Sequence, residues 1–304
     1  MTVVGGSRVI VRSNDFVLLD SLEPRYAEFL SDPPGFGDAP VALDVQVVCG
    51  PPPVAAGDIV FDTDSAWIMR EDGEGYRLEL RRLDAVDPYA VVLCDADTSH
   101  AVIHLTGPDG TAPSAGSEVL NPFGYPLDEL VFMNHLSSRR AMIVHSAGLQ
   151  LNVGGEQVGL VFPGASAAGK TTLSMMLVDA GLGAGLLSDD RMILRLGDDG
   201  AVGAWGTPWP GDGGFARNER VPLRSLLFLV QSESDAIIPL GADKALRRLM
   251  PVVSCPWYDR QRFPDVLETC GRVAAAVPCY ELRFTRGGAV ADVLARHAAA
   301  LVSS

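Results

Sequence analysis

The 304-residue sequence predicts a mixed α/β protein built from mixed sheets, in two parts. Three observations point to this fold class. Apolar residues make up 47% of the chain and charged residues 20%, which provides enough apolar material for a core and excludes a disordered chain. Strand-like runs alternate with stretches of helical spacing, and a turn-rich segment at residues 107–116 separates the two parts. We therefore expect a smaller N-terminal mixed α/β module over residues 1–120 and a second domain over residues 121–304.

The expected N-terminal module contains one helix and several short strands. Residues 22–31 have helical spacing and end before Asp32-Pro33-Pro34-Gly35, because proline and glycine stop a helix. This part of the sequence carries no recognisable chemical signature, so its role as a scaffold or as a recognition module stays open. The strand-like runs, several rich in β-branched residues and bounded by turn formers, cover residues 9–11, 41–49, 76–83, 89–94 and 100–105.

The second part begins with a predicted amphipathic helix over residues 127–140, in which apolar residues recur at helical spacing. A strand over residues 141–144 follows and leads to His145. Residues 149–153 and 157–162 then flank a Gly-Gly pair that is typical of a hairpin turn. The second strand of this hairpin leads directly into a glycine-rich segment.

That segment, GASAAGKT at residues 164–171, matches the pattern G-x-x-x-x-G-K-[ST] at every fixed position. Residues 172–180 follow it with helical spacing, so the pattern lies between a strand and a helix, as a phosphate-binding loop requires. In such a loop the backbone N–H groups and the helix N-terminus bind phosphate oxygens. The residues expected to bind a nucleotide are Gly164, Ala165, Ser166, Ala167, Ala168, Gly169, Lys170, Thr171 and Thr172.

Lys170 is one of only two lysines among 24 basic residues, which favours a role that needs a compact ammonium group. We expect it to reach the β- and γ-phosphates of ATP, and we expect the Thr171 hydroxyl to bind Mg²⁺. Two adjacent carboxylates, Asp189 and Asp190, end an apolar stretch downstream, where a strand end would lie beside the loop. We assign Mg²⁺ to Asp189, directly or through water, and the role of base to Asp190. An acidic turn is the structural alternative.

A glycine- and proline-rich segment over residues 206–218 lies between two strand-like stretches. Such a loop can approach a ligand closely, and Arg217 could neutralise the charge of a transferred phosphate. The alternative is a surface loop in which Arg217 pairs with an acid such as Asp212.

The formal net charge of −14 argues against nucleic acid and anionic membranes as partners, because repulsion would oppose encounter. The five cysteines form no CxxC pair, and the N-terminal residues lack the pattern of a secretory leader. No apolar run reaches the roughly 18 residues of a membrane span. These features predict a soluble cytoplasmic protein with reduced thiols, and they leave its oligomeric state open.

The order of strand, His145, hairpin, phosphate loop and acidic pair resembles that of the HPr kinase family, whose fold is shared with phosphoenolpyruvate carboxykinase. The resemblance implies that His145 and the two acids serve phosphoryl transfer. It spans roughly residues 125–290 and rests on HSAG (145–148), GLVFPGASAAGKTTL (159–173), LLSDDRMIL (186–194), GTPWPG (206–211), ARN (216–218), VPL (221–223) and PWY (256–258).

The resemblance and the motifs together predict a kinase that uses ATP and Mg²⁺ to phosphorylate a hydroxyl, with a serine of a protein or peptide as the first expected acceptor. The expected catalytic residues are His145, Lys170, Asp189, Asp190 and Arg217. Two alternatives are a kinase for a small-molecule alcohol and a regulatory module that binds or hydrolyses ATP without transfer. Phosphoenolpyruvate carboxykinase chemistry is less favoured, because that enzyme is substantially longer and its Mn²⁺ ligands find no match here. The preference for ATP or GTP is not fixed by the sequence.

Overall fold

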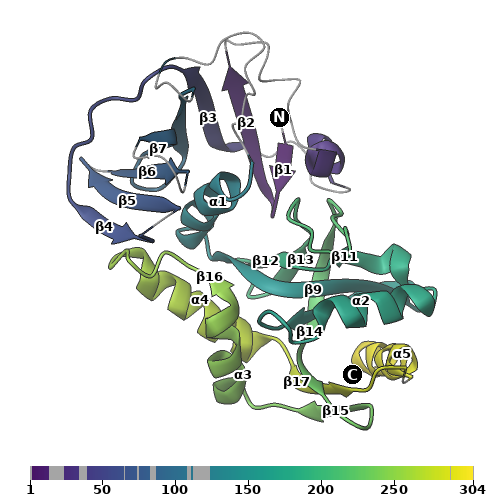
Figure 1. The fold of residues 1–304 in the computed structure, drawn as a ribbon. Helices are drawn as coiled ribbons and strands as arrows, with labels where there is room; N and C mark the ends of the chain where they lie inside the picture. Colours follow the sequence, from purple (N-terminus) through teal and green to yellow (C-terminus); the bar gives the residue numbers. More distant parts are fainter. Residues whose placement is uncertain are drawn as a thin grey trace.

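A computed structural model describes residues 2–13, 24–33, 40–64, 66–73, 75–82, 87–107, 111, 124–287 and 289–303 of the chain. Most of the expected linker at residues 107–116 lies outside these ranges. Within them the protein is mixed α/β, mostly sheet with a few helices, as the sequence predicts. The strands form two sheets that lie on either side of one helix (Figure 1).

The first sheet has eight strands in the order β1-β2-β3-β8-β7-β6-β5-β4. β2, β3 and β8 pair in parallel, and the strands from β8 to β4 form an antiparallel meander. The bounds are β1 (Thr2–Val4), β2 (Ser7–Ser13), β3 (Val41–Cys49), β4 (Ile59–Asp62), β5 (Trp67–Asp72), β6 (Gly75–Arg81), β7 (Pro88–Cys94) and β8 (His100–Leu105).

All five strands expected in this part are present. Residues 41–49 and 100–105 coincide with β3 and β8, and residues 9–11, 76–83 and 89–94 overlap β2, β6 and β7, with residue 83 outside the described ranges. The sequence did not predict the remaining three strands, β1, β4 and β5. The expected helix at residues 22–31 is a 3₁₀ helix, η2 (Pro24–Leu30).

The second sheet has nine strands in the order β10-β9-β12-β13-β14-β17-β15, and both β11 and β16 pair with β9. β10 also pairs with β14, so β10, β9, β12, β13 and β14 close into a ring of five strands. The bounds are β9 (Ala141–Val153), β10 (Glu156–Pro163), β11 (Leu186–Ser188), β12 (Arg191–Leu196), β13 (Val202–Trp205), β14 (Arg220–Gln231), β15 (Ala236–Pro239), β16 (Val253–Ser254) and β17 (Cys279–Phe284).

Two strands of the ring are long because each serves two sets of partners. The first residues of β9 pair with β12, and its later residues pair with β10. β14 pairs first with β13 and then with β10 and β17, both in parallel. The C-terminal ends of β10, β14 and β17 therefore lie at one edge of the sheet, which is where ligands gather in parallel α/β sheets.

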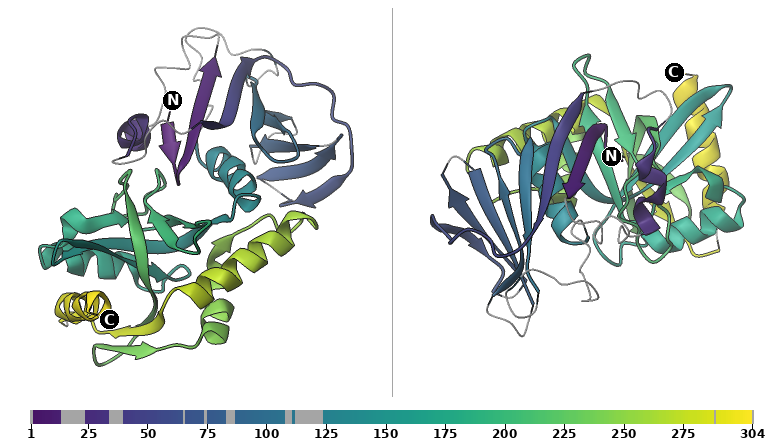
Figure 2. Two further views of the ribbon diagram at one scale, coloured as in Figure 1. Left: turned by 180° about the vertical axis from the view of Figure 1, so that it is seen from behind. Right: turned by 90° about the horizontal axis from the view of Figure 1, so that it is seen from above.

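Helices cover the second sheet in two groups (Figure 2). Apolar residues of α2 and α5 pack in one buried cluster with β9 and β10, and those of α3 and α4 pack in another with β12 and β14. No helix among the described residues is long and apolar enough to cross a membrane. The bounds are α1 (Leu127–Ser137), α2 (Lys170–Asp179), α3 (Ala242–Leu249), α4 (Arg262–Ala276) and α5 (Val290–Val302), with the short 3₁₀ helices η3 (Gly183–Gly185) and η4 (Met250–Val252).

α1 lies between the two sheets and is buried on nearly all sides. The expectation of an amphipathic helix is therefore wrong, because the polar side of α1 is also covered. Its buried polar residues instead find partners: Asp128 accepts hydrogen bonds from Arg25, Tyr26 and Trp209. This satisfies the rule that polar groups enter a protein interior with their hydrogen bonds made.

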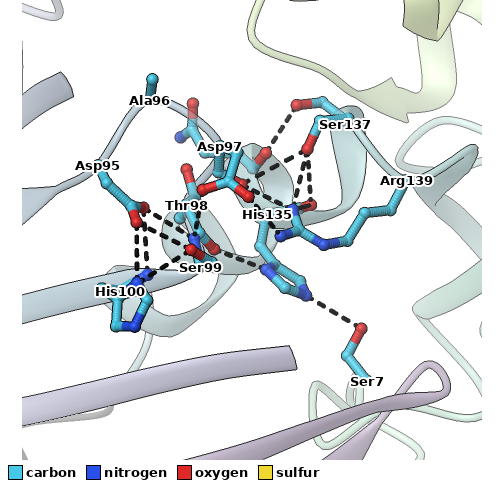
Figure 3. A network of polar contacts seen from close by, with 12 residues as sticks. Ser7, Asp95, Ala96, Asp97, Thr98, Ser99, His100, His135, Ser137 and Arg139 are labelled. Atoms are coloured by element: carbon cyan, nitrogen blue, oxygen red, sulfur yellow. Dashed lines mark hydrogen bonds and ion pairs between the residues drawn. The ribbon is translucent and has the colours of Figure 1, made fainter. Parts of the chain in front are cut away.

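His135 of α1 makes a second buried contact to the first sheet (Figure 3). Its Nδ1 lies 2.7 Å from the carbonyl oxygen of Thr98, and its Nε2 lies 3.1 Å from the hydroxyl of Ser7. Burial, reinforced by the positive charge of Arg139, lowers the pKa of His135 to about 4. The imidazole is therefore neutral at neutral pH, with Nδ1–H as donor and Nε2 as acceptor.

Candidate functional site

The glycine-rich loop lies between β10 and α2, as the sequence predicts for a phosphate-binding loop. Gly169 stands before the helix with a φ of 103°, a left-handed conformation, and a side chain there would come within 2.9 Å of Phe284. A side chain at Gly164 would come within 2.7 Å of the Ala168 Cβ. The loop thus needs glycine at both ends. The N–H groups of Gly164 and Ala168 donate to the carbonyl oxygens of His145 and Ala165, so a phosphate would be met by other N–H groups of the loop.

Lys170 opens α2 and folds back over the loop. Its Nζ donates to the carbonyl oxygens of Gly164 and Ala165 at 2.9 and 3.2 Å. Burial lowers the pKa of Lys170, and the nearby charge of Asp190 opposes this shift. A partly buried ammonium held only by neutral carbonyls gains by meeting an anion, which is the partner that a phosphate would supply.

His145 and Asp190 form a hydrogen-bonded pair close enough to Lys170 for the charge of Asp190 to act on its pKa. The Nε2 of His145 lies 2.7 Å from Oδ1 of Asp190, and Oδ2 of Asp190 accepts from Nη1 of Arg191 at 2.7 Å. Burial alone would raise the pKa of Asp190, but the hydrogen bond from His145 and the charge of Arg191 outweigh it and lower that pKa. Asp190 is therefore ionised at neutral pH.

Asp189 lies with Asp190 in the bend between β11 and β12, but its carboxylate has other partners. It is 1% exposed, and its two carboxylate oxygens accept from the backbone N–H groups of Gly211 and Gly213 at 2.9 and 2.6 Å. Glycine is needed at position 213, where a Cβ would lie 2.6 Å from Oδ2 of Asp189. In this arrangement Asp189 fixes the loop over residues 206–218, and a direct bond of Asp189 to a metal ion would compete with these hydrogen bonds.

Arg217, the fifth residue expected to be catalytic, is not among the residues that line the cavity shared by Lys170 and Asp190. Its guanidinium donates to the carbonyl oxygen of Ala184 and to the carboxylate of Glu219. Glu219, not Asp212, is thus its ion-pair partner. The contact with Ala184 connects the end of the loop over residues 206–218 to η3.

A cavity of about 570 Å³ brings Lys170, His145 and Asp190 together, and its volume is in the range of ligand pockets. Gln231 and Arg286, which the sequence analysis did not select, also line it. They follow from topology. β14, which ends at Gln231, pairs in parallel with the loop-bearing β10, and β17, just beyond which Arg286 lies, pairs in parallel with β14. The complete lining is His145, Ser166, Ala167, Gly169, Lys170, Thr171, Thr172, Asp190, Gly211, Asp212, Gln231 and Arg286.

The cavity fits a nucleotide phosphate with Mg²⁺ better than it fits a metal ion alone. Among the residues that the structure describes, no three His, Cys, Asp or Glu side chains are grouped so as to hold a metal ion. Mg²⁺ does not need such a cage, because it keeps several waters and binds one or two carboxylates together with substrate phosphates. The Thr171 hydroxyl and the carboxylates of Asp190 and Asp212 line the cavity and supply oxygen donors of that kind.

No protein-family model matches the chain, and no curated protein sequence matches it.

Proposed function

We propose that this protein is a Mg²⁺- and ATP-dependent kinase of the HPr kinase-like type, which transfers the γ-phosphate to a hydroxyl. A serine of a protein or peptide is the first proposed acceptor. The observation that carries the proposal is that residues of the phosphate loop, Lys170 and Thr171 line the same cavity as the His145–Asp190 pair. In the same proposal, residues 121–304 form the catalytic domain and residues 1–120 form an attached module.

Each of these groups has a task in phosphoryl transfer, which depends on positioning and charge stabilisation more than on covalent chemistry. ATP with Mg²⁺, when bound, would supply the phosphoryl group and additional positive charge. The N–H groups of the loop and the N-terminus of α2 would bind phosphate oxygens. The Nζ of Lys170 would exchange its two carbonyl partners for phosphate oxygens, and Thr171 would hold the metal ion.

In the same cavity, Asp190 would orient the acceptor hydroxyl and accept its proton at a carboxylate oxygen. His145 would hold that carboxylate in place through the hydrogen bond at Oδ1. Asp189 would keep Gly211 in the wall of the cavity through its hydrogen bonds to Gly211 and Gly213, and any contact of Asp189 with Mg²⁺ would pass through water. Arg217 would act on the loop from outside the cavity rather than on the transferred phosphate.

The test is incubation of the protein with γ-labelled ATP, Mg²⁺ and an extract of its own cells, followed by separation of proteins, peptides and small molecules. The proposal predicts label on a protein or peptide hydroxyl, and none with the Lys170→Ala variant. Label on a small-molecule alcohol would move the acceptor class but keep the kinase. Label released only as free phosphate would replace the kinase with an ATPase.

A further inference from the structure

A chain of polar side chains runs from the cavity into the interior of the protein. It begins with His145, whose ring contacts Asp190 at 2.7 Å. Asp190 accepts from Nη1 of Arg191 at 2.7 Å, and Nε of Arg191 donates to Oε1 of Glu129 at 3.1 Å. The hydroxyl of Ser254 donates to the same oxygen at 3.1 Å. The chain therefore links the wall of the cavity to α1.

The inner members of this chain are nearly enclosed: the side chains of Arg191 and Glu129 are 18% and 12% exposed. Strand pairing places two members of the chain, because Arg191 lies opposite His145 in the β12–β9 pair and Ser254 lies opposite Ile143 in the β16–β9 pair. A charged pair at this depth has lost most of its water, so each group depends on the partner that it faces.

Arg191 transmits position from one acid to the other because its guanidinium is a rigid plane. Glu129 holds the plane at Nε, and the plane then presents Nη1 to Oδ2 of Asp190. With Oδ2 held, Oδ1 is left to His145, and the rotation of the carboxylate in the cavity is set from both sides. Without Glu129 the guanidinium would keep its bond to Asp190 but would lose the contact that fixes its own orientation.

We propose that Glu129 is a positioning residue for Asp190, acting through Arg191, and that α1 is thereby part of the site. The inference rests on the proposed kinase function for its catalytic consequence. The neighbouring residue in α1, Asp128, accepts hydrogen bonds from Arg25 and Tyr26 at η2 and from Trp209 in the loop over residues 206–218. α1 thus contacts the N-terminal part through Asp128 and also carries Glu129, which orients Asp190 through Arg191.

The test compares Glu129→Ala with Glu129→Gln, since glutamine keeps an oxygen that can accept from Arg191 and Ser254. For Glu129→Ala we expect kcat to fall roughly 10–100-fold, the usual loss when a partner behind a ligating group is removed. KM for ATP should stay within about twofold, because the phosphate loop is untouched. Glu129→Gln should recover most of kcat.

The matched controls are Glu79→Ala and Glu79→Gln, which alter a buried acid that contacts Arg70, Arg77 and Arg81 in the first sheet. They should lower stability without changing kcat per folded molecule. An unchanged kcat in Glu129→Ala would overturn the proposal. So would equal losses in Glu129→Ala and Glu129→Gln, or a loss that follows the folded fraction alone.

A second readout needs no turnover: the ¹⁵N NMR signals of the His145 ring in the nucleotide-free protein, assigned with a His145→Gln variant. Glu129→Ala should shift these signals, whereas Glu129→Gln and Glu79→Gln should leave them nearly in place. Unshifted signals in Glu129→Ala would overturn the positioning role. A wild-type protein that transfers no phosphate would refute the proposed function, and the ring signals would still decide whether Glu129 orients Asp190.

Discussion

The two sheets treat their charged residues in opposite ways. In the first sheet, Glu79 is nearly buried and lies against Arg70, Arg77 and Arg81, so its charge is fully used in holding neighbouring strands together. In the second sheet, Asp190 is also paired, with His145 and Arg191, but its side chain is 30% exposed and lines the cavity. The same kind of carboxylate–arginine contact is thus structural in one sheet and leaves a carboxylate available for chemistry in the other.

Topology explains the difference. The first sheet is largely an antiparallel meander, in which each strand returns beside its predecessor and charged side chains meet across neighbouring strands. The second sheet contains three parallel strands whose ends share one edge. Loops at such an edge bring together residues that are distant in sequence, which gives the cavity its mixture of a lysine, acids and backbone N–H groups.

The largest expected effect belongs to Lys170, the only cation that folds back over the phosphate loop in the described structure. Lys170→Ala should abolish turnover of ATP, because it removes the ammonium that is held at the carbonyl oxygens of the loop. Lys170→Arg should fail as well, since a planar guanidinium does not fit where a compact ammonium is held. Phosphate release and transfer are measured in parallel; wild-type rates in either variant would remove the loop from the mechanism.

Asp190→Asn should cut phosphoryl transfer by roughly 10²–10⁴-fold, the usual contribution of a positioned base. Nucleotide affinity should stay near wild type, because asparagine keeps the size of the side chain and the phosphate loop is unaltered. Single-turnover transfer and the dissociation constant for ATP are measured on the same preparation. If Asp189 and Asp190 could each be changed to asparagine without loss of rate, these two carboxylates would not be the catalytic centre.

Glu79→Gln sharpens the comparison from the other side. Removal of the charge leaves buried arginines without their partner, and such a loss costs about 3–5 kcal/mol of unfolding free energy. Denaturant unfolding measures this cost, and transfer per folded molecule should equal that of the wild type. A catalytic defect in the folded variant would blur the distinction between the two sheets.

His135, between the sheets, should make the stability depend on pH. Because its pKa is lowered from 6.5 to about 4 in the folded protein, the unfolded chain binds more protons between these values. The free energy of unfolding should therefore fall by about 3 kcal/mol as the pH is lowered across this window. His135→Asn, which keeps a donor toward Thr98, should show a shallower fall. Other groups with shifted pKa values, among them His104 and His297, contribute to the slope in both proteins alike. Equal slopes for the two proteins would refute the assignment.

Asp189→Asn should have the smallest of these effects. One of the N–H groups of Gly211 and Gly213 would then face an amide donor, at a cost of about 1–3 kcal/mol in stability. Nucleotide affinity should also weaken as the wall of the cavity loosens. The control is Asp212→Asn, an exposed acid in the same loop, which should change stability by no more than about 0.5 kcal/mol. An equal loss of stability in both variants would contradict the role given to Asp189.

Local patterns predicted the parts of the fold that local chemistry determines. The β-branched runs of β3 and β8 and the strand–loop–helix around Lys170 were found in this way. The strand β5 was not, since its residues 70–72 are charged and its pairing depends on β4 and β6. The polar residues of α1 misled in the same sense, because only the two sheets together decide that they are buried.

The candidate site shows the same division. His145, Lys170 and Asp190 belong to contiguous motifs, and the structure brings them to one cavity. Gln231 and Arg286 belong to no motif, and only the parallel pairing of β14 and β17 takes them to the phosphate loop. Arg217 could not be placed from its own sequence, because its neighbour in space, Ala184, is set by the turn after α2.

The proposed kinase requires that the cavity around Lys170 bind a nucleoside triphosphate through its phosphates. This is measured by calorimetric titration with a non-hydrolysable ATP analogue and Mg²⁺. We expect binding at one site per chain in the wild type and in Asp190→Asn, and its loss in Lys170→Ala. Equal binding by the wild type and Lys170→Ala, or no binding by the wild type, would contradict it.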